Sequence, residues 1–186
     1  MNQSALAGGF ADPPQDAARA FRGLMQAMAR PGRIETVGGV VPPAPLSVAA
    51  GTVLVTLCDP ETGLHLAGAH DTPNVREWIT FHTGAPLVPA TEAAFVLGTW
   101  DAIELDALPL GTPEYPDRSA TVIVEMTDLT TKGATLTGPG IRETAGLNLP
   151  DIARFQQNAA LFPLGLDFYF TCDARIAALP RSTKVA

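Results

Sequence analysis

Two short apolar runs, Thr52–Cys58 and Ser119–Met126, place the strongest constraint on how this chain can fold. Both runs are almost uninterrupted and rich in β-branched residues, which is typical of strands that are covered on both faces. Strand-like and helix-like segments alternate around them along the sequence. This alternation predicts an α/β fold, in which a mixed β-sheet is flanked by helices and a single domain covers residues 15–186.

Residue spacing predicts the other elements. Apolar residues recur at three- and four-residue intervals between Gln15 and Ala29, which predicts an amphipathic helix with Asp12 as its N-cap. The preceding residues, Met1–Pro14, are polar and contain Gly and Pro, so we expect a flexible N-terminal arm. The other expected helices are Leu46–Ala50, Pro73–His82, Asp101–Ala107 and Leu149–Leu161. The other expected strands are Arg33–Val37, Leu64–Leu66, Ala94–Leu97, Thr135–Thr137, Asp167–Thr171 and Arg175–Leu179.

The charge of the chain argues against one class of partner. The formal net charge is −7, there are only two lysines, and the arginines are scattered singly. Nucleic-acid binding without sequence preference needs several phosphate contacts from Lys and Arg, so no nucleic-acid partner is expected. Charged residues make up 17% of the chain, below the roughly 25% of a typical globular domain. Either other subunits cover part of the surface, or the surface is rich in Gly, Pro, Ala and Thr.

The cysteines and the N-terminus indicate a cytoplasmic protein. Cys58 and Cys172 lie in or beside expected strands and form no CxxC motif, so we expect buried, reduced thiols. The sequence begins without the pattern of a signal peptide. No apolar run approaches the roughly 18 residues of a membrane span, so no membrane partner is expected.

The sequence carries no recognisable catalytic or metal-binding motif. His65, His70 and His82 show none of the spacings HxH, HxxxH or HExxH that place imidazoles around a metal ion. A GxSxG sequence, which presents a nucleophilic serine at a strand-to-helix turn, is also absent. We therefore assign no catalytic residue, no metal ligand and no cofactor.

Hydrogen-bond donors near turns are the candidates for ligand binding. The expected strand that ends at Leu179 is followed, after Pro180, by an Arg-Ser-Thr sequence, whose guanidinium and hydroxyl groups suit an anion site or an interface. The turn Gly138-Pro139-Gly140 comes just before Arg142, and is either a plain tight turn or part of an anion or interface contact. The full set of candidate residues for an anion, another ligand or an interface is Arg22, His82, Arg142, Arg181, Ser182 and Thr183.

Two further regions have both an ordinary and a functional interpretation. Glu114 and Asp117 lie beside Arg118 in a long loop, where a salt bridge with Arg118 is expected in preference to an acid/base pair. The helix Gln15–Ala29 carries arginines beside a face with Phe, Leu and Met side chains. This helix is either an ordinary amphipathic helix or a packed subunit interface.

Six segments, taken together in their order and spacing, resemble one protein family. They are Asp16–Met28 followed by Pro31-Gly32, Phe81–Pro86, Gly111–Thr121, Leu136–Ile141, Phe162–Asp167 and Leu179–Thr183. This series is similar to that of PhnH, a subunit of the bacterial carbon–phosphorus lyase system for phosphonate use. The resemblance extends over nearly the whole chain.

The resemblance implies a fold similar to that of pyridoxal-phosphate-dependent transferases, without the cofactor. A Schiff base needs a buried, activated lysine, whereas Lys132 falls in an expected turn and Lys184 in the C-terminal tail. Proteins of the family form homodimers and join the G, I and J subunits in a core complex, with the L and K subunits as transient partners. With the L subunit, that complex supports the transfer of a ribose triphosphate unit from ATP to an alkylphosphonate, which gives alpha-D-ribose 1-methylphosphonate 5-triphosphate.

Two functions are consistent with the residues and the resemblance. The first is a structural or accessory subunit of the carbon–phosphorus lyase complex that is not catalytic alone. The alternative is an independent phosphonate- or nucleotide-binding enzyme, whose anion site would use the arginine and hydroxyl side chains named above. Convergence of these side chains in one pocket favours the second function, and their spread over an apolar face favours the first.

Overall fold

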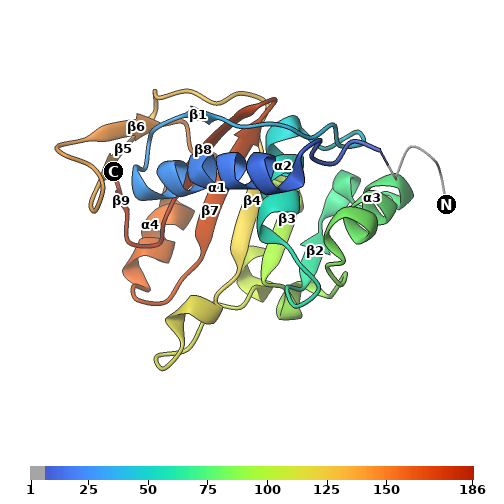
Figure 1. The fold of residues 1–186 in the computed structure, drawn as a ribbon. Helices are drawn as coiled ribbons and strands as arrows, with labels where there is room; N and C mark the ends of the chain where they lie inside the picture. The colour runs from blue at the N-terminus through green and yellow to red at the C-terminus, as the bar shows by residue number, and fades with distance from the viewer. Residues whose placement is uncertain (1–6) are drawn as a thin grey trace.

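The computed structural model describes residues 7–186, and its centre is a six-stranded sheet with the order β1-β8-β7-β4-β3-β2 (Figure 1). The strands are β1 (Glu35–Thr36), β2 (Leu64–Leu66), β3 (Phe95–Thr99), β4 (Thr121–Glu125), β7 (Asp167–Cys172) and β8 (Arg175–Leu179). β2, β3, β4 and β7 run parallel, whereas β8 is antiparallel to β7 and β1 is antiparallel to β8. The expected α/β fold with a mixed sheet is therefore confirmed.

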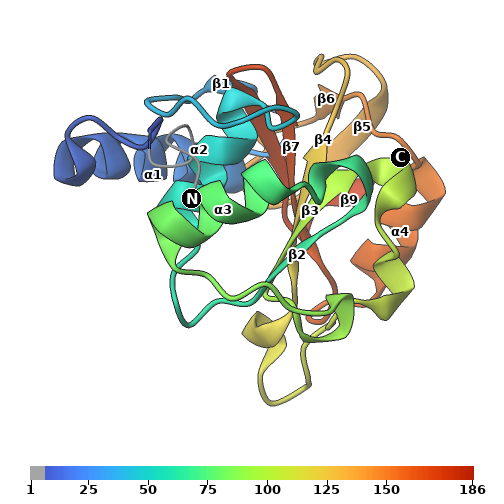
Figure 2. The ribbon, with the colours of Figure 1, turned by 90° about the vertical axis from the view of Figure 1, so that its right-hand side faces the viewer.

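Helices and a smaller sheet cover the two faces of the central sheet. The helices are α1 (Pro13–Ala29), α2 (Val48–Leu57), α3 (Pro73–Thr83) and α4 (Ile152–Ala160). The smaller sheet is antiparallel with the order β6-β5-β9 and consists of β5 (Ala134–Thr137), β6 (Ala145–Leu147) and β9 (Lys184–Val185). Figure 2 shows α1, α2 and α3 on one side of the central sheet, and α4 with the smaller sheet on the other. No helix in the described part of the chain is long and apolar enough to span a membrane.

Strand β4 joins the two apolar cores that these layers create. Ile123 belongs to the core beneath α1, α2 and α3, whereas Val122 and Val124 belong to the core beneath α4. All three side chains are fully buried, and each such burial stabilises the fold by about 1.5–3 kcal/mol. The prediction that Ser119–Met126 contains a strand covered on both faces is therefore confirmed.

The prediction of a strand at Thr52–Cys58 is wrong, because this run forms most of helix α2. The helix begins at the N-cap Ser47, whose Oγ accepts a hydrogen bond of 3.0 Å from the N–H of Ala50. Within it, Thr52 and Thr56 donate their hydroxyl protons to the carbonyl four residues earlier, at 2.7 and 2.6 Å. The first six residues after Val48 are all buried, so the helix has no polar stripe from which its period could be recognised. The short helix expected just before this run is the start of the same helix.

Helix α1 starts slightly earlier than predicted, and the Asp12 side chain does not cap it. It begins at Pro13, in agreement with the preference of proline for the first turn. The Asp12 side chain makes no capping hydrogen bond; instead the Asp12 N–H donates to Oδ2 of Asp16 at 3.0 Å. A carboxylate in the first helical turn therefore replaces the expected cap and also favours the helix dipole.

The segment before α1 makes specific contacts with the helical layer. Residues 1–6 of the expected arm lie outside the described residues. The carbonyl oxygen of Ala7 accepts a hydrogen bond of 3.1 Å from Nε1 of Trp78, and that of Gly8 accepts one of 2.8 Å from the N–H of Val41.

The remaining elements agree with the sequence in kind but not always in length. The expected strand Arg33–Val37 pairs only at β1, and the expected helix Asp101–Ala107 is replaced by two 3₁₀ turns, Trp100–Ala102 and Leu105–Ala107. The expected helix Leu149–Leu161 is limited to α4. Strands β6 and β9 are not predicted, because two or three residues are too few to show an alternating pattern. The other elements form within two residues of their expected ends.

Candidate functional site

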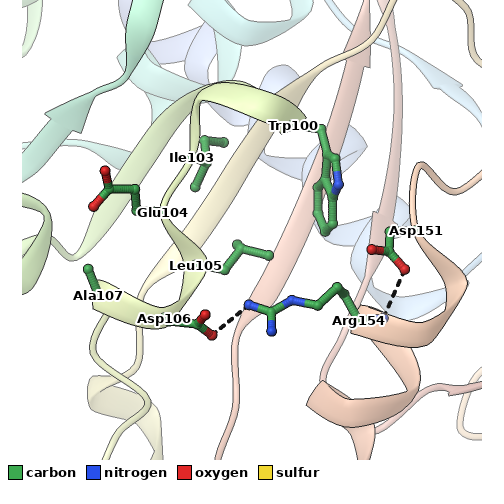
Figure 3. A pocket seen from close by; sticks show the side chains of 8 residues that line it. All are labelled: Trp100, Ile103, Glu104, Leu105, Asp106, Ala107, Asp151 and Arg154. Atoms are coloured by element: carbon green, nitrogen blue, oxygen red, sulfur yellow. Dashed lines mark hydrogen bonds and ion pairs between the residues drawn. The ribbon is translucent and has the colours of Figure 1, made fainter.

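An open pocket of about 610 Å³ lies between the segment that follows β3 and the start of α4 (Figure 3). It is lined by Trp100, Ile103, Glu104, Leu105, Asp106, Ala107, Asp151 and Arg154. A smaller pocket of about 200 Å³ adjoins it, because Trp100, Leu105, Asp106 and Arg154 line both. We call the two pockets together the β3–α4 groove. The volume of the first lies within the range of about 300–1,000 Å³ that is typical of ligand sites.

Local structure on each side positions the side chains of this groove. Asp151 is the N-cap of α4, and its Oδ1 accepts a hydrogen bond of 3.1 Å from the N–H of Arg154. The start of α4 is thereby fixed, and Arg154 extends across the mouth of the groove, where Nη2 donates to Oδ1 of Asp106 at 2.6 Å (Figure 3). On the inner wall, the Trp100 ring packs on Phe155 with a centroid distance of 4.9 Å.

The groove carries more negative than positive charge. Glu104, Asp106 and Asp151 supply three carboxylates, and Arg154 is the one cation among the residues that line the two pockets. Its guanidinium already pairs with Asp106. A phosphonate or a nucleoside triphosphate is negatively charged, and the carboxylates of Glu104 and Asp151, with which the Arg154 guanidinium does not pair, repel it. The groove therefore suits an apolar or cationic group better than an anion.

Arg181, the centre of the predicted anion site, is bound to its own chain. Its side chain is only 14% exposed, and Nε lies 3.2 Å from both carboxylate oxygens of Asp167. Nη2 also donates to Oδ2 of Asp167, and Nη1 donates to the carbonyl oxygen of Pro116. The backbone N–H of Arg181 adds a hydrogen bond of 2.8 Å to Oδ1 of Asp167. The guanidinium therefore joins the start of β7 to the loop before β4.

The two hydroxyl residues that follow do not complete an anion site around Arg181. Thr183 is 1% exposed, and its Oγ1 is buried without a hydrogen-bond partner among the described residues. Its backbone N–H closes a turn by donating to the carbonyl oxygen of Pro180 at 2.9 Å. Ser182 lies between them and is partly buried.

Arg142 is exposed and follows a tight turn that rests on the end of α1. The turn is closed by a hydrogen bond of 3.2 Å from the N–H of Ile141 to the carbonyl oxygen of Gly138. At Gly140, φ is +80° and a Cβ atom would lie 2.0 Å from the carbonyl oxygen of Ala29. Only glycine fits this approach, so the Gly-Pro-Gly sequence places Arg142 near the C-terminus of α1.

The other two predicted residues lie on the helical layer. Arg22 is on the exposed side of α1 and makes no ion pair with a residue that the structure describes. His82 is on α3, where its ring packs on Trp78 at 5.0 Å and its Nε2 lies 3.2 Å from the carbonyl oxygen of Ala7. Within residues 7–186, no hydrogen bond or ion pair joins any two of the six predicted residues.

Sequence reasoning missed a partly buried polar cluster at the carboxyl ends of the parallel strands. Glu125, at the end of β4, accepts hydrogen bonds from the N–H of Ser47 at 2.7 Å and from Oγ1 of Thr171 at 2.9 Å. His70 is 4% exposed, and its Nδ1 has no hydrogen-bond partner among the described residues. Burial lowers the pKa of His70, and the nearby charge of Glu125 opposes that shift. An ordinary loop sequence around His70 gives no signal of this burial.

Other potentially reactive side chains are arranged for structure. The expected salt bridge at Arg118 is not formed; its guanidinium lies over the ring of Tyr115, 4.0 Å from the centroid. Burial, with a smaller contribution from Asp59, raises the pKa of the Cys58 thiol to about 12, so the thiol stays protonated at neutral pH. No group of three His, Cys, Asp or Glu side chains within the described range could hold a metal ion.

Comparison with known proteins gives two concordant findings. Residues 8–186 match the model of one family, described as bacterial phosphonate metabolism protein (PhnH). A relative from Rhizobium meliloti (strain 1021), the alpha-D-ribose 1-methylphosphonate 5-triphosphate synthase subunit PhnH, is 40% identical over 189 residues. The alignment covers 96% of this chain and 94% of the relative.

Proposed function

The chain belongs to the PhnH family of bacterial phosphonate metabolism proteins, and on that basis we propose that it is a subunit of the carbon–phosphorus lyase complex. In this role it supports the formation of alpha-D-ribose 1-methylphosphonate 5-triphosphate from ATP and an alkylphosphonate. The observation that carries the proposal is the 40% identity to a synthase subunit over 96% of this chain. Because the alignment covers almost all of both proteins, the whole domain is shared.

We propose that the contribution of the chain is structural or accessory and that it is not catalytic alone. Two features support this. The β3–α4 groove has a surplus of carboxylates, which opposes the binding of phosphate groups. Arg181, the centre of the predicted anion site, is already paired with Asp167. These features weigh against the alternative, an independent phosphonate- or nucleotide-binding enzyme with an anion site at Arg181, Ser182 and Thr183.

The finer points of the family resemblance are proposals of the same kind. The expected partners are the G, I and J subunits, with L and K as transient partners, and the chain alone is expected to form a homodimer in the cytoplasm. The fold is expected to resemble pyridoxal-phosphate-dependent transferases without use of the cofactor. In support, Lys132 and Lys184 are both exposed, whereas a lysine that forms a Schiff base is activated by burial or by a neighbouring cation.

Co-expression with the G, I and J subunits tests this function. We expect a tagged form of the chain to retain all three subunits in constant ratio, and we expect omission of the chain to reduce synthesis of the triphosphate product. A chain that stays apart from the other subunits would contradict the proposal. Calorimetric titration of that free chain with ATP and with methylphosphonate would then test the enzyme alternative, for which a saturable heat is required.

A further inference from the structure

We propose that the outer side of α1 is a docking surface for another protein subunit, which presents acidic side chains around an apolar centre. We call this surface the basic face and define it by Ala18, Phe21, Arg22, Met25 and Arg30, all of which are exposed. The inference rests on the proposed function, because the partner is a subunit of the same complex. It goes further by assigning the surface and the chemistry of its partner.

Phe21 and Met25 form the apolar centre of the basic face. They are 51% and 48% exposed, and residues four positions apart are neighbours on one side of a helix. Leu24 and Ala27 of the same helix face inward and are buried in the core. The helix therefore has a second apolar surface that its own chain does not cover, and α1 lies on the outside of the molecule in Figure 1. Aromatic residues and Met are enriched in interfaces.

The charge around this centre is opposite to that of the rest of the chain. Residues 13–33 contain four arginines and one acidic residue, a net charge of +3, whereas the whole chain carries −7 and the remainder therefore −10. Arg19 pairs with Asp16 and Arg33 with Glu35, but Arg22 and Arg30 make no ion pair with a described residue. Arg142 is exposed and lies two residues after Gly140, which approaches the carbonyl oxygen of Ala29 at the end of α1, so it adds a further positive charge near that end.

The charge pattern selects the kind of partner. A second copy that docked face to face through α1 would bring Arg22 and Arg30 of one copy against the same two arginines of the other, which is unfavourable at short range. An anionic membrane or a nucleic acid would meet the negative charge of the remainder of the chain. A protein surface with acidic side chains around an apolar patch matches both the centre and the rim of the basic face.

The experiment measures the affinity of the labelled full-length chain for the purified complex of the G, I and J subunits. Phe21→Glu places a charge at the centre, and we expect the Kd to rise at least about 30-fold, as for a central interface residue. Arg22→Glu reverses a rim charge and is expected to weaken binding about 10-fold, whereas Arg22→Lys keeps the charge and stays close to wild type. Raising the salt from about 50 to 500 mM should weaken the wild-type complex more than that of Arg22→Glu.

Two matched variants provide the control on regions away from α1. Phe162→Glu makes the same change at an aromatic side chain that is 61% exposed, in the segment between α4 and β7. Lys132→Glu makes the same charge reversal at an exposed cation beside β5. Both are expected to bind like wild type, and circular dichroism of all variants shows that the fold is unchanged.

The outcomes separate this inference from the proposed function. Failure of the wild-type chain to bind the other subunits would remove the proposed function itself. If the wild-type chain binds and the Kd of Phe21→Glu is unchanged, the docking surface is not on α1, and the proposed function still stands. If Phe21→Glu loses binding but Arg22→Glu does not, the inference that the partner is acidic is wrong.

A change in the mass of the isolated chain caused by Phe21→Glu, with the complex intact, would show that a second copy occupies the face. Co-sedimentation with phosphatidylserine vesicles that Phe21→Glu abolishes, with the complex intact, would likewise overturn the inference.

Discussion

The basic face of α1 and the β3–α4 groove both combine apolar surface with charged side chains, but only in the groove is the arginine paired with a carboxylate of the described chain. In the groove, Arg154 pairs with Asp106, and the Trp100 ring packs on the buried Phe155. On α1, the guanidinium of Arg22 makes no ion pair with a described residue, and half of the Phe21 side chain is exposed. Charges that are paired within the chain stabilise the fold, whereas unpaired charges beside exposed apolar groups remain available for a partner.

The two regions also differ in the sign of their charge, although they belong to one domain. The groove has two more carboxylates than guanidinium groups, and α1 has a surplus of arginines. A single net charge of −7 hides this division. The division is useful in an assembly, because surfaces of opposite sign orient a subunit before the apolar contacts form.

The strongest test of the comparison is truncation of one aromatic side chain in each region. Phe155→Ala should lower the free energy of unfolding by about 3–5 kcal/mol, because it opens a cavity in the core. Phe155 is 1% exposed, and its ring contacts those of Trp100, Phe168 and Phe170 at 4.9–5.7 Å. Phe21→Ala should change the same quantity by no more than about 0.5 kcal/mol, because it removes surface that is already exposed. Urea denaturation followed by circular dichroism measures both.

Should Phe155→Ala fail to fold, Phe155→Leu provides the comparison with a smaller cavity, since most of the apolar volume is kept. A loss of stability for Phe21→Ala similar to that for Phe155→Leu would mean that α1 is completed by its own chain. The contrast between the two regions would then be wrong.

A second test concerns a charged pair that is more deeply buried than those of either region. Arg181→Ala leaves the Asp167 carboxylate with only the backbone N–H donor and leaves the carbonyl of Pro116 without this partner. We expect a loss of about 1–3 kcal/mol in stability. Arg181→Lys should recover only part of it, because a lysine cannot reproduce the planar fork. If thermal denaturation showed no loss for Arg181→Ala, the guanidinium would be free to bind an anion, and the enzyme alternative would gain support.

A third test uses pH to probe the buried His70 in the polar cluster at the strand ends. Because burial lowers the pKa of His70 in the folded state, the unfolded chain binds a proton first as the pH falls below the ordinary value of about 6.5. The contribution of His70 to the free energy of unfolding is therefore fully present above that pH. It is lost as the pH falls toward the folded-state pKa. The slope for this one proton is at most about 1.4 kcal/mol per pH unit.

Replacement of this histidine checks the assignment. The melting temperature of wild type should fall more between pH 7.5 and 5.5 than that of His70→Asn, which carries no titratable group. Equal pH dependence in the two proteins would mean that His70 is not the group that titrates. The Glu125 carboxylate, which accepts hydrogen bonds from Ser47 and Thr171, is present in both proteins.

The sequence predicts the central sheet well and fails where burial removes the pattern. β4 is recognisable because its β-branched run is short and bounded by turn residues. The run at Thr52–Cys58 is likewise short, apolar, rich in β-branched residues and bounded by turn residues, but it lies in a helix that is packed between α1, α3 and the sheet. Only its tertiary neighbours distinguish the two cases, and the hydrophobic period gives no information for a fully buried segment.

The candidate residues follow the same rule in another form. The sequence shows that Arg142 and Arg181 carry hydrogen-bond donors beside structural breaks, and that Arg22 lies within the helical pattern of residues 15–29. It does not show that Asp167 lies opposite Arg181, because that pair joins the start of β7 to the segment after β8. The groove was missed for a similar reason: its walls come from segments about fifty residues apart, and Arg154 meets Asp106 only in the folded chain.

The smallest expected effect comes from the pair that closes the mouth of the groove. Arg154→Ala removes a bond to Asp106, whose side chain is 88% exposed, so stability should fall by only about 0.2–1 kcal/mol. The electrostatic effect is clearer, because the groove then has three carboxylates and no cation. A small organic cation such as choline should gain affinity for Arg154→Ala relative to wild type and lose it again in the double variant with Asp106→Asn. Nuclear magnetic resonance shifts of the Trp100 indole would report this order. If Arg154→Ala gained affinity for ATP in place of choline, the negative charge assigned to the groove would be wrong. The contrast in charge between the groove and α1 would then be wrong as well.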